Sequence, residues 1–356
     1  MPSAPRAPRR VWNPPNPYLA EHRELIGEPP VAELEVWEDR SRGVLSKNES
    51  PDIDFTWSVN PYRGCFHACA YCYARRTHEY LGLGAGTDFE RKLWVKPDAP
   101  AQLAKALSKR SWKRELIVFS GNTDPYQPLE AAWKLTRRCL EVCAEHRNPV
   151  GIITKSALVR RDEDVLSHLA DSSGVRVFLS IPFLDEDVAA RMEPGAPTVR
   201  RRFETVRVLA EAGIPVGVSV SPIIPGLNDA DIPGVLQEAK RCGATSAFYA
   251  LLRLPGSVKD VFLQRLHDQL PLRAARVEQR IRDARGGELN KSAFGERQRG
   301  EGRYWESVHD LWELWTRKTG LQKRGTGDAA PPLNPAPDPP ASPPPREPRT
   351  QMELSL

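Results

Sequence analysis

The chain has 356 residues, 34 prolines and a formal net charge of +5, and 40% of its residues are hydrophobic. This length allows one large domain or two ordinary ones, and the composition is that of a globular protein. No run of about 18 apolar residues is present, which argues against a transmembrane helix. No apolar segment of a secretory signal follows the basic N-terminus. We therefore expect a cytoplasmic protein without membrane contact, and a charge this small does not by itself indicate a nucleic-acid partner.

Proline is concentrated at the two ends of the chain, with six in residues 1–17 and ten in residues 331–348. Segments rich in proline and charge bury too little apolar surface to fold alone. We expect residues 1–54 to form an N-terminal extension that is partly disordered. Residues 321–356 are expected to form a proline-rich disordered tail.

Between these ends, short apolar runs rich in β-branched residues alternate with amphipathic stretches. The expected strands are 57–64, 116–120, 150–154, 175–181, 216–221 and 246–252, with helices near 99–110, 127–147, 161–171, 198–212 and 229–242. This alternation predicts an α/β fold with a parallel sheet over residues 55–260, either a doubly wound sheet or an incomplete (βα)6 TIM-like barrel. Both folds place the working face at the carboxyl ends of the strands. Residues 261–320 are expected to form a helical C-terminal extension.

Three of the six cysteines, Cys65, Cys69 and Cys72, lie within eight residues in the spacing C-x3-C-x2-C. Three thiolates this close can hold a metal centre. Structural zinc takes four ligands, and His67 is the nearest possible fourth. Iron–sulfur clusters also usually take four cysteines, so three ligands would leave one iron open to a small molecule. The remaining cysteines are expected to be small core residues, namely Cys139, Cys143 and Cys242.

The spacing, with the sequence YCYAR around Cys72, resembles the signature of radical S-adenosylmethionine (SAM) enzymes. Together with SGNTDPYQPLE at 120–130 and ITKS at 153–156, it resembles the spore photoproduct lyase-like branch of that superfamily over roughly residues 45–320. The resemblance implies an incomplete (βα)6 barrel of the radical SAM type. It also implies a [4Fe–4S] cluster on Cys65, Cys69 and Cys72 with SAM on the fourth iron. Reductive cleavage of SAM would yield a 5′-deoxyadenosyl radical that abstracts hydrogen from a substrate, chemistry that belongs to the cofactors.

The same resemblance implies a set of SAM-binding residues at the carboxyl ends of the strands. Lys155 would reach the carboxylate of SAM, Ser180 its methionine or ribose part, and Tyr71 the border of the adenine. The polar residues after the second strand would complete the set: Ser120, Asn122, Thr123 and Asp124. The alternative is that the hydroxyl side chains only cap the following helices.

The lyase-like resemblance implies DNA or another nucleic acid as the substrate, in DNA repair. Residues 265–303 add modest support, with ten Lys/Arg against six Asp/Glu. The lyase uses a cysteine near the second strand as hydrogen donor, whereas this chain has none between residues 73 and 138. Tyr126 and Tyr249 are hydrogen-donor candidates by position alone. Two alternatives stay open: radical modification of RNA, a protein or a small molecule, and a non-enzymatic zinc-binding nucleic-acid module.

Two protein partners are expected. The radical SAM resemblance implies an electron donor such as a flavodoxin or ferredoxin. The last six residues, from Gln351 to Leu356, resemble the short peptides by which bacterial repair proteins bind the DNA sliding clamp. A short apolar motif on a disordered arm suits such recognition.

Overall fold

The computed structural model describes residues 13–19, 33–41 and 43–324. The expected clamp-binding peptide and most of the proline-rich tail lie outside these ranges. Within the described ranges, every helix is too short or too polar to cross a membrane.

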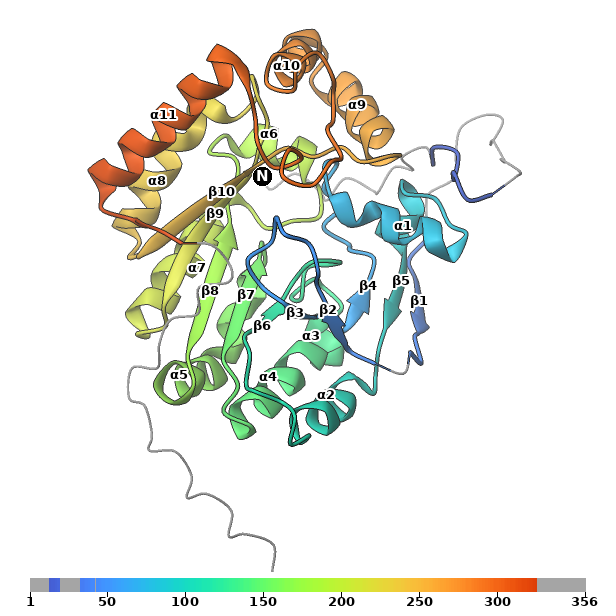
Figure 1. Ribbon diagram of the computed structural model, residues 1–356, viewed down its shortest axis with the longest axis vertical. Coiled ribbons are helices and arrows are strands. Elements are labelled where there is room, and N and C mark those ends of the chain that lie inside the picture. The colour runs from blue at the N-terminus through green and yellow to red at the C-terminus, as the bar shows by residue number, and fades with distance from the viewer. Residues whose placement is uncertain (1–12, 20–32, 42, 325–356) are drawn as a thin grey trace, which may run out of the picture.

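An eight-stranded sheet forms the centre of the molecule (Figure 1). Six parallel strands stand in chain order: β3 (Trp57–Val59), β6 (Ile117–Phe119), β7 (Val150–Thr154), β8 (Val175–Ser180), β9 (Val216–Ile223) and β10 (Ser246–Leu251). The edges carry β2 (Leu45–Lys47), antiparallel to β3, and β11 (Gln322–Lys323), parallel to β10. Because β2 and β11 are opposite ends of one sheet rather than partners, the barrel is incomplete, as expected from the sequence.

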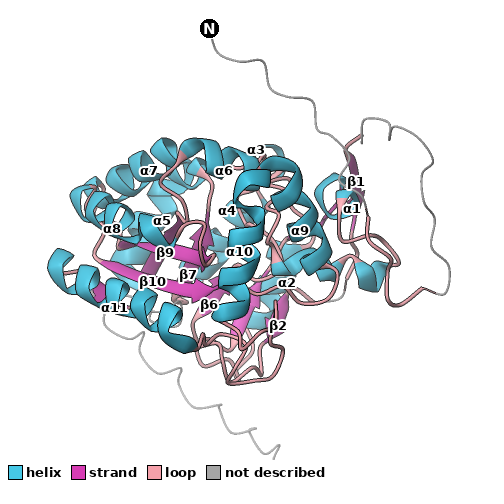
Figure 2. Ribbon diagram, turned by 90° about the horizontal axis from the view of Figure 1, so that it is seen from above, coloured by secondary structure: helices cyan, strands magenta, loops and turns pink. Residues whose placement is uncertain are grey.

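Helices cover one face of this sheet, as seen from above in Figure 2. The covering helices are α2 (Ala99–Leu107), α4 (Leu135–Glu145), α5 (Glu163–Ser172), α7 (Val199–Glu211), α8 (Ile232–Arg241) and α11 (Gly302–Thr319). The shorter α3 (Glu130–Trp133) and α6 (Glu186–Met192) lie in the loops after β6 and β8, and α9 (Val258–Gln269) and α10 (Pro271–Asp283) follow β10. The strands are apolar on both faces, as is usual for a parallel sheet.

The other face of the sheet lines the inside of the barrel. Ser219 is the cross-strand partner of both Ser180 and Phe248, so these three side chains point to this inner face. Phe178 and Phe248 meet edge to face across β9, with ring centroids 4.8 Å apart. The position between them is Gly217, where a Cβ would lie 2.5 Å from Phe178. These two rings fill the interior below Ser180, which leaves the carboxyl ends of the strands for a site.

A second, three-stranded sheet was not expected from the sequence. It consists of β1 (Glu35–Glu38), β5 (Lys92–Val95) and β4 (Tyr62–Arg63), with β5 in the middle and α1 (Thr87–Arg91) directly before it. The expected strand over 57–64 is therefore wrong in extent. Pro61 cannot donate a ladder hydrogen bond, and the chain leaves the main sheet there. The residues that follow pair with β5 instead.

Two further boundaries differ from expectation. The helix expected over 127–147 is interrupted at Lys134, whose φ of 51° is left-handed, so α3 and α4 are separate helices. In addition, β11 lies within the expected tail, whose first residues therefore belong to the main sheet.

Candidate functional site

The three cysteines lie in the loop that follows β4. The loop begins at Gly64, whose φ is +73° and where a Cβ would lie 2.6 Å from Leu93 and 2.9 Å from the ring of His78. Only glycine fits both the backbone conformation and the space. The amide of Cys65 then donates to the carbonyl of Phe89 at 3.1 Å, which ties the loop to α1.

The cysteine loop is also docked against the turn after α6, more than 120 residues away in the chain. The amide of Ala70 donates to the carbonyl of Met192 at 2.9 Å, and the amide of Gly195 donates to the carbonyl of His67 at 3.0 Å. A Cβ at Gly195 would overlap the carbonyl oxygen of Phe66. The loop conformation therefore depends on contacts across the barrel mouth.

A buried arginine braces the loop from inside. Arg75 donates from Nε to the carbonyl of Cys69 at 2.9 Å, and its Nη2 lies 2.6 Å from Oε1 of Glu90. Its side chain is fully buried, so the ion pair and the carbonyl contacts satisfy a guanidinium that water does not reach.

The three cysteine thiols lie close enough together to influence one another. Burial raises the pKa of Cys72 to about 11, and the neighbouring Cys65 adds to the shift. Burial raises the pKa of Cys69 as well, with contributions from Glu193 and from both other cysteines. None of the described side chains forms a ready-made shell of three or more Cys, His, Asp or Glu ligands around one metal ion. The chemistry of the loop, three neighbouring thiols as soft donors, is that of ligands to an iron–sulfur cluster.

Asp124 connects the cysteine loop to the end of β7. Its Oδ2 lies 3.3 Å from Nδ1 of His67 and accepts from the backbone amide of Lys155 at 2.7 Å. Its Oδ1 accepts from the hydroxyl of Thr154 at 2.6 Å. Burial disfavours the charged form of His67, but Asp124 and the sulfur of Cys65 outweigh it and raise the pKa of His67 to about 10. One carboxylate therefore fixes both the histidine of the loop and the strand end that carries Lys155.

Lys155 stands at the centre of a buried polar cluster at the ends of β7 and β8. Its ammonium donates to Oγ of Ser180 at 2.6 Å and lies 3.3 Å from Oε1 of Glu193. Oε2 of Glu193 lies 2.5 Å from Nη2 of Arg202, and Tyr71 donates its phenol to the same carboxylate. Burial lowers the pKa of Lys155 to about 8. The cluster brings a cation and a hydroxyl to the edge of the cysteine loop.

The residues after β6 divide into two groups. Thr123 is buried and donates from Oγ1 to the carbonyl of Gly64 at 2.7 Å, so its hydroxyl supports the cysteine loop. Gln127 donates to the same carbonyl at 3.0 Å. By contrast, Ser120 is half-buried and Asn122 is exposed, held through its amide to Asn60 at 3.0 Å. Their side chains are thus left at the mouth of the barrel.

The two tyrosines considered as hydrogen donors lie elsewhere. Tyr249 is on the helix-covered face of β10, 4.8 Å from the ring of Trp312, and its phenol is bonded to His309 at 2.9 Å. That face is opposite to the one shared by Ser180 and Phe248. Tyr126 is fully buried, and burial together with the neighbouring Asp162 raises its pKa. The phenol of Tyr249 is therefore directed to His309, and that of Tyr126 to Asp162.

The run of three arginines at 200–202 does not show from its composition which of them is buried. Arg202 is 1% exposed and pairs with Glu193, whereas Arg200 is exposed. Helical spacing offers the only signal, because Arg202 shares a face of α7 with the buried Val199 and Val206.

The incomplete barrel, with a three-cysteine loop at the carboxyl ends of its strands, defines the class of the protein. The sequence model of the radical SAM superfamily matches residues 59–239, which is half of the chain. The chain therefore belongs to the radical SAM superfamily.

Several known proteins are similar to this chain. The uncharacterized protein Rv2578c of Mycobacterium tuberculosis is 36% identical over 223 residues, which cover 61% of this chain and 66% of that protein. The chain thus spans just under two thirds of that relative. A radical SAM Nα-GlyT isomerase of Pseudomonas phage M6 is 22% identical over 85% of this chain and 62% of its own length. In fold, the chain is similar to spore photoproduct lyase complexed with dinucleoside spore photoproduct, with a TM-score of 0.60 and 18% identity over 85% and 87% of the two chains.

Proposed function

We propose that this radical SAM enzyme binds a [4Fe–4S] cluster through Cys65, Cys69 and Cys72 and acts by hydrogen abstraction on a nucleic-acid substrate. The observation that carries the proposal is the position of the cysteine loop against the buried cluster of Lys155, Ser180 and Glu193. Three thiols and a cation meet at the carboxyl ends of neighbouring parallel strands, where sites of this fold are built. When bound, the cluster supplies the electron for reductive cleavage of SAM.

The protein's own residues would bind and orient SAM. Lys155 offers a point charge for the carboxylate of SAM. Ser180 and Glu193 hold the ammonium group of Lys155 in place. The Tyr71 ring lies 5.7 Å from the same ammonium, and its phenol is fixed by Glu193. Ser120 and Asn122 stand at the mouth with their side chains accessible to a ligand. Burial of the whole cluster excludes water, which protects reactive intermediates.

Two observations support a nucleic-acid substrate. The lyase of similar fold has been seen with a bound dinucleoside photoproduct, and also with AdoMet and that photoproduct together. The basic segment 265–303 lies in the described chain and includes α10, whose residues are largely exposed. We infer a role in DNA repair or modification, with an external electron donor such as a flavodoxin or ferredoxin. RNA, a protein and a small molecule are the alternative substrates.

Anaerobic reconstitution of the full chain tests the cluster. We expect about four irons per chain, visible absorption near roughly 400 nm and formation of 5′-deoxyadenosine with dithionite. Cys72→Ala should lose all three, whereas Cys242→Ala, at the end of α8, should keep them. Stoichiometric zinc in place of iron, or a fully active Cys72→Ala variant, would contradict the proposal. Deuterium transfer from labelled substrates to 5′-deoxyadenosine then separates DNA from RNA, protein and small molecules.

A further inference from the structure

An exposed aromatic ring stands directly beside the cysteine loop. Tyr73 follows the last cysteine and is 50% exposed, although it lies at the start of a short helical turn against the barrel mouth. The guanidinium of Arg253, from the loop after β10, lies over this ring at 5.9 Å from its centroid. The pair joins the cysteine loop to the far edge of the main sheet.

The guanidinium of Arg253 is half-buried and makes neither an ion pair nor a side-chain hydrogen bond with any described residue. Burial lowers the pKa of Arg253, and the positive charge of Arg297 lowers it further. The carboxylate of Asp52 acts on Arg253 electrostatically, but it is already paired with Arg297 at 2.5 Å. An additional anion is thus the group that this position lacks.

A second pair of the same kind lies beside the first. The guanidinium of Arg297 lies 4.4 Å from the centroid of Phe294, which is 63% exposed. Arg297 is fixed by Asp52 and Ser50, and the amide of Gly295 also donates to Asp52 at 2.8 Å. These contacts fix Arg297, which in turn holds the ring of Phe294 in an exposed position.

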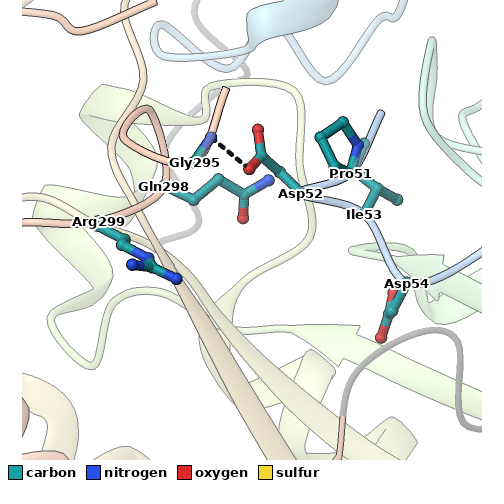
Figure 3. A pocket seen from close by; sticks show the side chains of 7 residues that line it. All are labelled: Pro51, Asp52, Ile53, Asp54, Gly295, Gln298 and Arg299. Atoms are coloured by element: carbon teal, nitrogen blue, oxygen red, sulfur yellow. Dashed lines mark hydrogen bonds between the residues drawn. The ribbon is translucent and has the colours of Figure 1, made fainter. Parts of the chain in front are cut away.

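A hollow of about 310 Å³ opens between the segments that make these contacts. Figure 3 shows Pro51 to Asp54 on one wall and Gln298 with Arg299 on the other, bridged by the hydrogen bond from Gly295 to Asp52. The guanidinium of Arg299 is exposed and has no ion pair among the described residues. Within the described chain, Arg299 is the one arginine that lines this hollow, whose wall also carries the carboxylates of Asp52 and Asp54. Phe294 and Arg297 belong to the same segment as Gly295, Gln298 and Arg299, so their pair borders the hollow.

We propose that Tyr73, Arg253, Phe294 and Arg297 form a binding site for unpaired nucleotides of a single-stranded nucleic acid. This inference rests on the proposed function and names the form of its substrate. Guanidinium groups suit phosphodiester oxygens, and exposed aromatic faces stack on bases. A duplex hides its base faces, so only a single strand or an extruded nucleotide uses both features. The site would deliver the neighbouring nucleotide to the cysteine loop.

Fluorescence anisotropy of the reconstituted full chain tests the site, with a labelled short oligothymidylate and its duplex with oligodeoxyadenylate as probes. We expect the single strand to bind more tightly than the duplex. Tyr73→Ala should weaken binding about tenfold, whereas Tyr73→Phe should preserve it, because stacking needs the ring alone. Arg253→Gln should lower the slope of log affinity against log salt by about 0.7 between about 50 and 200 mM salt. The matched control is Lys318→Gln, which removes a cation 4.8 Å above Trp315 on α11 and should change nothing.

Three results would overturn the inference. The first is wild-type affinity in both Arg253→Gln and Tyr73→Ala, and the second is equal affinity for the duplex and the single strand. The third is displacement of the labelled probe by polyglutamate as effectively as by unlabelled oligothymidylate. Iron content and circular dichroism identify a variant that has lost its fold, and Arg253→Gln remains informative if Tyr73→Ala loses the cluster. The outcome is separate from SAM cleavage. If the reconstituted chain cleaves SAM but does not bind the oligonucleotide, only the proposed nucleotide site is contradicted. If it binds the oligonucleotide but does not cleave SAM, only the proposed catalytic function is contradicted.

Discussion

The guanidinium of Arg202 lies 2.5 Å from a carboxylate oxygen of Glu193, and both side chains are at most 1% exposed. Breaking a buried ion pair is strongly destabilising, and without Arg202 the carboxylate of Glu193 keeps only Lys155 as an ion-pair partner among the described residues, at 3.3 Å. Arg202→Met should therefore lower the free energy of unfolding by about 3–5 kcal/mol, measured by chemical denaturation. The exposed pair of Arg241 and Glu238 on α8 provides the control, and Arg241→Met should cost less than about 1 kcal/mol. Similar losses in the two variants would contradict this view of the buried pair.

Gly64 and Gly82 offer a test of how tightly the cysteine loop is packed. Both have left-handed backbones, with φ of +73° and +74°, but a Cβ at Gly82 meets no atom within 4 Å. Gly82→Ala should therefore cost only the backbone strain, about 1–2 kcal/mol. Gly64→Ala adds a clash with Leu93 and His78, and we expect at least about 2 kcal/mol of further destabilisation and loss of iron from the reconstituted chain. An equal loss of stability in the two variants would show that the loop accommodates the added Cβ at Gly64 without strain.

Thr123 separates a supporting role from contact with SAM. Its hydroxyl donates to the carbonyl of Gly64, which also accepts from Gln127. Thr123→Val should therefore cost about 1 kcal/mol in stability and leave the affinity for SAM unchanged. Isothermal titration of the reconstituted chain with SAM measures this, with Lys155→Met as the variant expected to weaken binding. Unchanged stability with weakened SAM binding would instead favour the role that the family resemblance implies for Thr123.

His78 should make stability depend on pH. Burial lowers the pKa of His78 to about 4 from an unfolded value of 6.5, so the unfolded chain binds its proton first on acidification. The stabilising contribution is fully present above pH 6.5 and is lost as the pH falls towards 4, by up to about 3 kcal/mol. Urea denaturation at several pH values, compared with His78→Gln, isolates this effect from other acid-sensitive groups. Parallel pH profiles of the two proteins would contradict the assignment.

The alternation of strand and helix runs predicts the parallel sheet but fits both a doubly wound sheet and an incomplete barrel. The resemblance to radical SAM enzymes implies the barrel, whose strands stand in chain order. The position of the cysteines after the first of these strands has the same origin. The three-stranded sheet escaped prediction because β1 pairs with β5 across more than 50 residues. The sequence pattern of residues 35–38 does not indicate which strand they pair with.

The candidate site also contains residues that the sequence indicates and pairings that it does not. Lys155 and Ser180 are implied by the family resemblance, and they stand at the carboxyl ends of β7 and β8. The pairings of Asp124 with His67 and of Glu193 with Arg202 depend on where distant segments meet, which spacing does not encode. Tyr249, a candidate by position alone, lies on the helix-covered face, because a one-residue change of position on a strand reverses the face of the sheet that a side chain occupies.

The docking of the cysteine loop on Met192 and Gly195 sets an order of assembly during synthesis. Residues 65–72 leave the ribosome long before the turn that receives them, and until then the thiols belong to an unsupported segment. Contacts between such distant residues form only after the intervening chain has been ordered. Insertion of the proposed cluster would therefore wait until at least the first four parallel strands and α6 have been made, and it would need a nearly complete barrel rather than a nascent peptide.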